Sequence, residues 1–190
     1  MKKTILLSLL FLFSNCVQAQ VSVLVVYHSE TGSTEQMARA VYEGATSVEG
    51  VDVRLLQSSD ATEADLLNTD AIIVGSPVYN ANVTPEISRF IASWPFEGEP
   101  LKNKIGAAFV TAGGISAGEE IVQMNILQSM LVFGMVIVGG SDWTQPFGAS
   151  AITGEEPFND SPEYRISAQF EEKGRALGER VAQLTLKFHQ

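Results

Sequence analysis

The alternation of short apolar segments with amphipathic helical segments constrains the fold of this chain more than any other feature. It runs from residue 21 to residue 188, and the apolar segments are nearly uninterrupted runs of β-branched and other hydrophobic residues. Such runs are typical of strands that are buried on both faces of a sheet. We expect five of these strands, at residues 21–27, 51–56, 71–75, 105–111 and 135–138.

Helices are expected between the strands, where hydrophobic residues recur at helical spacing. Their predicted spans are about 33–48, 61–68, 85–93, 119–133 and 162–188. Strands that alternate with helices pair in parallel through right-handed crossovers. The pattern therefore predicts a three-layer, doubly wound α/β fold with a five-stranded parallel sheet, and it leaves the strand order open. Residues 139–161 are rich in Gly, Pro, Ser and Thr, and we expect them to form a loop over the carboxyl edge of the sheet.

The composition of the chain excludes several classes of function. The 190 residues suffice for one domain, and 45% hydrophobic residues allow a full core. A formal net charge of −10, without any lysine- or arginine-rich run, argues against nucleic acid as a partner. The two histidines, His28 and His189, belong to no spaced cluster of metal ligands, and no GxSxG nucleophile motif is present. We therefore expect no metal site, and no residue stands out as catalytic.

Residues 1–19 have the pattern of a signal peptide. Lys2 and Lys3 precede an apolar stretch at residues 5–13, which is short for a membrane span, and the Val-Gln-Ala at residues 17–19 fits the cleavage pattern. The sequence predicts export to the periplasm, cleavage after Ala19, and a mature domain of residues 20–190 that retains no membrane span. The alternative is a lipoprotein anchored through Cys16, the one cysteine of the sequence.

The loops that follow the first, third and fourth predicted strands form the candidate site, because doubly wound sheets bind ligands at the carboxyl ends of their strands. The first loop, residues 29–34, opens a helix whose N-terminal N–H groups and positive dipole end suit a phosphate. Gly32 lets the backbone approach a ligand closely. The candidate phosphate-binding residues are Ser29, Thr31, Gly32, Ser33 and Thr34. The alternative interpretation is an ordinary capping box, with Ser33 or Thr34 as the helix cap.

The other two loops offer surfaces for a planar ligand. In residues 75–80, a proline fixes the backbone and Tyr79 presents an aromatic face. In residues 111–118, three glycines let backbone groups approach the edge of a ligand. The candidate residues are Ser76, Pro77, Val78, Tyr79 and Asn80 in the second loop, and Thr111, Ala112, Gly113, Gly114 and Gly118 in the third. Each loop is alternatively an ordinary strand-to-helix turn.

In order and spacing, these three loops resemble the loops that bind flavin mononucleotide (FMN) in the flavodoxin-like superfamily. Residues 29–34 are similar to the flavodoxin phosphate loop, Ser-x-Thr-Gly-x-Thr. The WrbA-type NAD(P)H:quinone oxidoreductases and the related NADPH-dependent FMN reductases resemble this chain at residues 75–90, 111–120, 133–138 and 146–150. The resemblance, which covers nearly all of residues 21–188, implies the strand order 2-1-3-4-5, non-covalent FMN and a homo-oligomer, either a dimer or a tetramer. It also implies that the first loop holds the phosphate, that the second frames the flavin ring, and that the third contacts the far edge of the ring or the ribityl side.

The function that this resemblance implies is FMN-dependent transfer of two electrons from NAD(P)H to a quinone-like acceptor. One alternative is an exported single-electron carrier of the flavodoxin type, which would serve a redox protein. Another is a non-redox binding protein that has kept the fold. The predicted export leaves the electron donor open, because reduced nicotinamide nucleotides are expected in the cytoplasm.

Overall fold

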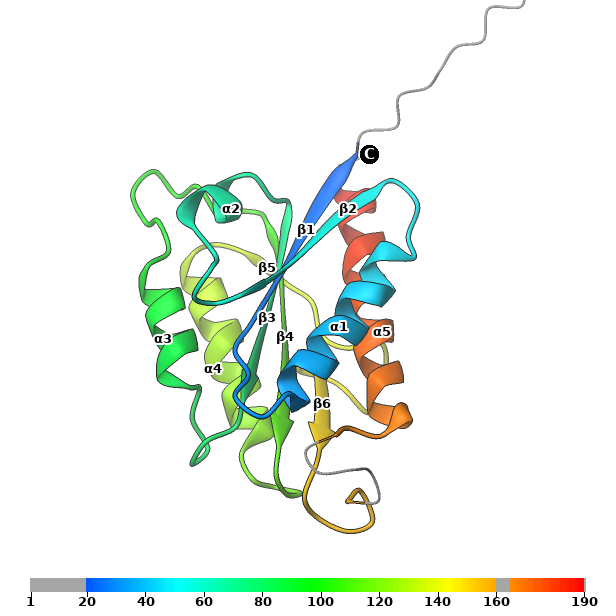
Figure 1. Cartoon of the computed structure of the whole chain (residues 1–190). Coiled ribbons are helices and arrows are strands. Elements are labelled where there is room, and N and C mark those ends of the chain that lie inside the picture. Colours follow the sequence, from blue (N-terminus) through cyan, green and yellow to red (C-terminus); the bar gives the residue numbers. More distant parts are fainter. Residues whose placement is uncertain (1–19, 160–164, 190) are drawn as a thin grey trace, which may run out of the picture.

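A computed structural model describes residues 20–159 and 165–189, which form a parallel sheet between two layers of helices (Figure 1). The strands are β1 (Val21–Tyr27), β2 (Val51–Gln57), β3 (Ala71–Pro77), β4 (Ile105–Ala112), β5 (Val136–Ile137) and β6 (Ala149–Ile152). They are hydrogen-bonded in the order β2-β1-β3-β4-β5, and β6 also pairs with β4. All of these pairs are parallel. The doubly wound fold and the strand order that the resemblance implied are therefore confirmed.

Helices cover both faces of the sheet. On one face lie α1 (Ser33–Thr46) and α5 (Ala168–Phe188), which pack against each other, and on the other lie α3 (Pro85–Ala92) and α4 (Glu119–Val132). The remaining helix, α2 (Glu63–Leu67), is short and begins at a capping box in which Thr62 and Asp65 exchange hydrogen bonds. Because both faces are covered, every residue of β3 and β4 is buried, as their continuous apolar runs predict.

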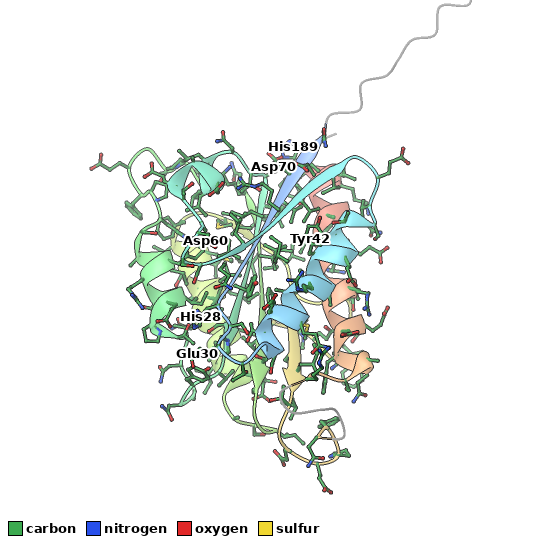
Figure 2. The ribbon with its side chains drawn as sticks, in the orientation of Figure 1. His28, Glu30, Tyr42, Asp60, Asp70 and His189 are labelled. Atoms are coloured by element: carbon green, nitrogen blue, oxygen red, sulfur yellow. The ribbon has the colours of Figure 1, made fainter. Side chains whose placement is uncertain are left out.

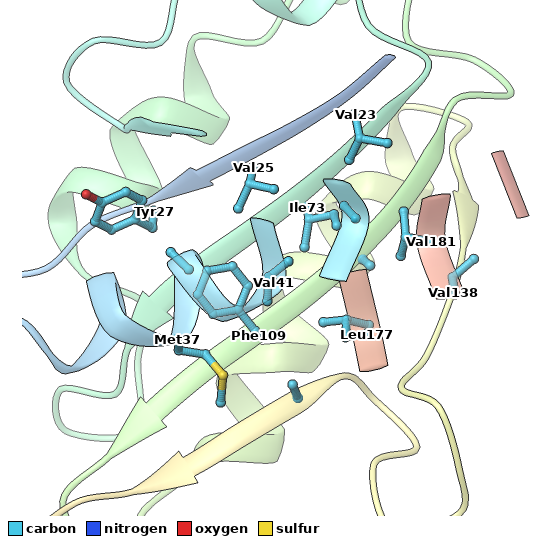
Figure 3. Close-up of a cluster of buried hydrophobic side chains, with 14 of the residues drawn as sticks. Val23, Val25, Tyr27, Met37, Val41, Ile73, Phe109, Val138, Leu177 and Val181 are labelled. Atoms are coloured by element: carbon cyan, nitrogen blue, oxygen red, sulfur yellow. The ribbon is translucent and has the colours of Figure 1, made fainter. Parts of the chain in front are cut away.

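The core is divided into two clusters by the sheet. Successive side chains of a strand point to opposite faces, so Val23 and Val25 join the cluster under α1 and α5, whereas Leu24 and Val26 join the cluster under α3 and α4. Figure 3 shows the first cluster, in which β1 and β4 side chains meet Met37, Val41, Leu177 and Val181 from the two helices. The same alternation decides which side of the sheet each residue beyond a strand end faces.

The structure corrects the prediction for the fifth strand. Only Val136–Ile137 of the expected strand at 135–138 pairs with β4, at Ile105 and Gly106. The chain then leaves the sheet and returns as β6, inside the segment expected to be a loop, to pair with the other end of β4 at residues 109–112. The return is close because Gly148 (φ 128°) lies against the Ala108 carbonyl, which a Cβ would approach to 1.9 Å. The edge strand is therefore one strand split in two by residues 138–148.

Helix boundaries also differ from the prediction by a few residues. The helix expected at 33–48 ends at Thr46, and the last helix, expected from 162, begins at Ala168. Part of that predicted first turn, residues 162–164, lies outside the described residues. Fraying and local caps, rather than hydrophobic spacing, decide such ends.

Two glycines bring α1 and α5 into backbone contact. A Cβ on Gly44 would lie 1.9 Å from the Arg175 carbonyl oxygen, and one on Gly178 would lie 1.9 Å from the Val41 carbonyl oxygen. Both positions therefore require glycine at this helix crossing, because the neighbouring atoms belong to the backbone and cannot rotate away. The contact holds the C-terminal half of α1 against α5.

The predicted signal peptide, residues 1–19, lies outside the described residues. Within residues 20–159 and 165–189, no helix is long and apolar enough to cross a membrane.

Candidate functional site

The three predicted loops meet at the carboxyl edge of the sheet. The Val78 amide donates to the Thr111 carbonyl over 2.8 Å, which joins the second loop to the third. The Thr34 and Thr111 hydroxyl oxygens lie 2.7 Å apart, which joins the first loop to the third. The sequence therefore identified segments that are distant along the chain and adjacent in space, although their role in binding stays a prediction.

The first loop turns at a glycine and opens α1. Gly32 is the N-cap in a left-handed conformation (φ 98°), and its N–H donates to the Ser29 hydroxyl over 3.1 Å. No side chain caps the helix, so the capping box with Ser33 or Thr34 at the cap is not formed. Among the described residues, a Cβ on Gly32 would meet no atom within 4 Å, so the loop faces open space within this part of the chain. The first turn of a helix presents N–H groups that the helix itself does not satisfy.

The chemistry of this first loop fits a phosphate held by neutral donors. Ser29 is partly buried, Thr31 is exposed, and neither lysine nor arginine occurs within residues 29–34. The lysine or arginine closest in sequence, Arg39, is paired with Glu35 at 2.6 Å. A dianion would therefore rely on hydroxyl groups, backbone N–H groups and the positive end of the α1 dipole.

The pair formed by Thr34 and Thr111 is buried, with 1% and 4% of the two residues exposed. Both were predicted to contact a ligand, and the structure directs their hydroxyl groups at each other. The pair thus links α1 to the end of β4 and fixes the distance between the first and third loops.

Replacing Thr111 with valine is expected to lower the free energy of unfolding by about 1.5 kcal/mol, because the Thr34 hydroxyl would stay buried without this partner. The double variant Thr34→Val/Thr111→Val removes both hydroxyl groups, and we expect it to be more stable than the sum of the two single losses predicts. Urea denaturation of the four proteins without added flavin measures this coupling. Strict additivity would show that the pair contributes nothing.

The second loop contains a tight turn beside buried residues. Ser76 and Pro77 are buried, and the Ser76 hydroxyl donates to the Pro77 carbonyl and accepts from the Thr84 amide. The Ser76 side chain therefore orders the loop from inside the protein. Tyr79 and Asn82 exchange two backbone hydrogen bonds across Asn80 and Ala81, which both have left-handed φ values, 53° and 57°. This turn leaves Tyr79 and Asn80 exposed at the edge of the sheet.

The Tyr79 hydroxyl donates to a Glu30 carboxylate oxygen over 3.2 Å, which ties the second loop to the first. Partial burial, and then the negative charge of Glu30, raise the pKa of Tyr79 above its usual value. The phenol therefore stays protonated across the physiological pH range and acts there as a neutral hydrogen-bond donor.

The third loop runs from Thr111 to the N-cap of α4, Gly118 (φ 107°). A Cβ on Gly118 would lie 2.5 Å from the Ala81 Cβ. The second and third loops therefore approach each other closely here because residue 118 has no side chain. A Cβ on Gly113 would meet none of the described residues within 4 Å, which leaves space on that side of the loop in the described structure. Thr111 and Ala112 are buried at the strand end, so a ligand would contact their backbone groups and not their side chains.

Two carboxylates already occupy backbone donors of this third loop. The Ile115 N–H donates to Glu155 over 2.6 Å, and the Ser116 N–H donates to Glu119 over 3.1 Å. Neither bond was predicted from the sequence. Glu119 lies only three residues after Ser116, in the first turn of α4, whereas nothing in the local pattern relates residue 155 to residue 115. Only the pairing of β6 with β4 brings them together.

A hollow that the sequence did not predict adjoins the first loop on the α3 side. It has a volume of about 320 Å³ and is lined by His28, Ser58, Ser59, Glu86 and Arg89, among others. The His28 Nε2 atom is buried and has no hydrogen-bond partner among the described residues; it lies 3.6 Å from Glu86 and 3.9 Å from Glu30. Figure 2 shows His28 and Glu30 at the carboxyl edge, whereas Asp70 and His189 lie at the opposite edge. Strand alternation continued one residue past Tyr27 would have placed His28 on the α3 face.

The described part of the chain contains no group of three or more His, Cys, Asp or Glu side chains that could hold a metal ion. The groups at this edge include hydroxyls, backbone N–H groups, the Tyr79 phenol, several carboxylates and, in the adjoining hollow, His28 and Arg89. Such a site can bind an anion at one end and a planar, hydrogen-bonding ring between its loops.

Comparison with known proteins agrees with this description. The family model of the NADPH-dependent FMN reductases matches residues 20–149. A flavodoxin from Aquifex aeolicus is 36% identical over 171 residues, which cover 85% of each chain. An NAD(P)H dehydrogenase (quinone) from Afipia carboxidovorans is 30% identical over 195 residues, which cover 88% of this chain and 98% of that protein.

Among solved structures, a WrbA-like flavodoxin protein from Agrobacterium tumefaciens has the same fold, with a TM-score of 0.69. It is 23% identical, and the match covers 90% of this chain and 99% of that one.

Proposed function

This chain belongs to the NADPH-dependent FMN reductase family, and from that premise we propose that its three loops bind FMN and that it transfers two electrons from NAD(P)H to a quinone-like acceptor. It is an FMN-binding oxidoreductase of the flavodoxin-like type. The observation that carries the assignment of the site is the open, left-handed Gly32 at the start of α1, in a loop that hydrogen bonds join to both other loops.

When bound, FMN supplies the chemistry of hydride transfer, and the protein supplies position and electrostatics. Ser29, Thr31 and the N-terminal turn of α1 would hold the phosphate through neutral donors. The turn at Tyr79 and Asn80 would frame one side of the ring, with the Tyr79 phenol kept protonated. The backbone around Gly113 and Gly114 would approach the other side.

A quinone acceptor and a nicotinamide donor are supported by the names of relatives such as the NAD(P)H dehydrogenase (quinone) of Afipia carboxidovorans. Reduction of a quinone to a hydroquinone takes up two electrons and two protons. The carboxylates around the loops, Glu30, Glu119 and Glu155, make the edge acidic, which favours a neutral acceptor over an anionic one. Export to the periplasm and assembly into a homo-oligomer stay predictions from the sequence.

Anaerobic mixing of FMN-loaded protein with NADPH, and separately with NADH, tests the donor. We expect bleaching of the flavin absorption with at least one nucleotide, followed by recovery of the colour when a water-soluble quinone is added. Protein that retains FMN but is bleached by neither nucleotide would contradict the proposed donor. Recovery no faster with quinone than without it would contradict the proposed acceptor.

The single-electron carrier is the second candidate, because the flavodoxin of Aquifex aeolicus matches over most of both chains. Stepwise reduction with dithionite separates the two functions. A carrier accumulates the one-electron-reduced form midway through the titration, whereas the proposed enzyme passes directly to the two-electron-reduced form.

A further inference from the structure

The segment after β6 lies along the third loop and is bonded to its backbone. The Thr153 amide donates to the Ala112 carbonyl over 3.0 Å, and the Gly154 amide donates to the Gly113 carbonyl over 2.9 Å. These bonds prolong the β4–β6 pairing beyond the ends of both strands. They bring residue 155 to the part of the loop that was predicted to contact a flavin.

Glu155 uses this position to place a carboxylate on a loop amide. The Ile115 N–H donates to Glu155 Oε2 over only 2.6 Å, a distance typical of a charge-assisted hydrogen bond. The approach depends on Gly114, because a Cβ there would lie 2.8 Å from the same oxygen. The neighbouring Ser116 N–H donates to Glu119, in a backbone conformation with positive φ (59°). Two consecutive amides of the loop thus each donate to a different carboxylate.

The bond from Ile115 to Glu155 is also one that the protein can release. Glu155 and Glu156 are both exposed, and no core packing holds the Glu155 side chain in place. Beside the bond, the Gly113 side of the loop faces open space. A ligand that accepts hydrogen bonds at this loop therefore finds one donor already occupied by a carboxylate that water can solvate.

We propose that Glu155 sets the affinity of the site for FMN by competing for the Ile115 N–H. The inference rests on the proposed function, because it takes the third loop as the one that contacts the flavin. Binding of FMN then requires the Glu155 carboxylate to release the amide and move into solvent. With the carboxylate in place, its negative charge also opposes a negatively charged ligand at the loop. Glu155 thus favours a cofactor that dissociates over one that is held permanently.

Replacing Glu155 with glutamine tests the proposal, because the amide keeps the size of the side chain and accepts a weaker hydrogen bond. Glu156→Gln is the matched control, since it removes the same charge at the next exposed residue, which accepts no such bond from the described residues. Titration of each protein into FMN, followed by quenching of the flavin fluorescence, gives the dissociation constants. We expect E155Q to bind FMN about fivefold or more tightly than wild type, and E156Q to stay within about twofold.

Weaker binding by E155Q would overturn the proposal, because the carboxylate would then support the loop instead of competing with the flavin. Equal affinities for E155Q and E156Q would overturn it as well, since any change in FMN affinity would then come from the loss of one negative charge and not from the bond to the Ile115 N–H. In both cases FMN still binds, so the proposed function survives. If none of the three proteins binds FMN while all are folded by circular dichroism, the proposed function fails and the inference fails with it.

Discussion

Replacing Gly32 with valine is expected to weaken FMN binding about tenfold or more, which corresponds to about 1.4 kcal/mol. Gly32 has a φ of 98°, which a β-branched residue adopts only with strain, and its missing side chain leaves open space in front of the α1 N-terminus. Valine would place methyl groups in the space assigned to the phosphate. Fluorescence titration with FMN measures the loss.

Gly98→Val is the matched control, because Gly98 also has a positive φ (78°) and a Cβ there would also meet nothing within 4 Å. It lies in the connection between α3 and β4, away from the three loops. Both variants carry the strain of valine at a left-handed position, and only G32V alters the proposed site. If G32V is folded and binds FMN as tightly as G98V does, the first loop does not hold the phosphate.

Replacing Gly178 with alanine is expected to lower the free energy of unfolding by about 3 kcal/mol, the upper end of the usual cost of overpacking. In an exposed helix the same change stabilises by roughly 1 kcal/mol. Here the new Cβ would lie 1.9 Å from the Val41 carbonyl oxygen and 2.8 Å from the Ala45 nitrogen, so α1 and α5 must move apart. Helix propensity alone predicts that G178A is more stable than wild type, whereas the close contact predicts that it is less stable. The sign of the measured change therefore distinguishes the two effects.

Urea denaturation of G178A measures this loss, and Glu179→Ala serves as the control on the exposed side of the same helix. We expect E179A to stay within about 0.5 kcal/mol of wild type. A G178A protein as stable as E179A would mean that the two helices are not in backbone contact at this position.

The layers of the fold and the place of the site could be predicted, because they depend on patterns that are local in sequence. Continuous apolar runs identify strands that are covered on both faces, and β3 and β4 are buried at every residue. The carboxyl edge follows from parallel pairing, so the loops after β1, β3 and β4 had to lie near one another. The strand order came from the resemblance to a family and not from the periodicity.

Several of the missed features depend on partners that are distant in sequence. The four residues of β6 carry too short a pattern to identify a strand, and only pairing with β4 makes them one. The carboxylate of Glu155 reaches Ile115 across 40 residues for the same reason. The Ser76 hydroxyl turns inward to the Pro77 carbonyl and the Thr84 amide of its own loop, and Thr34 on α1 pairs with Thr111 at the end of β4. Residue type alone does not show these partners, so the sequence assigned all three side chains to a ligand.

Binding of FMN at this edge is tested by the visible absorption spectrum of purified protein that has been mixed with FMN and then dialysed. We expect wild-type protein to retain flavin absorption after dialysis and G32V, treated in parallel, to lose most of it. A folded wild-type protein that is colourless after dialysis would show that this flavodoxin-like fold does not bind FMN.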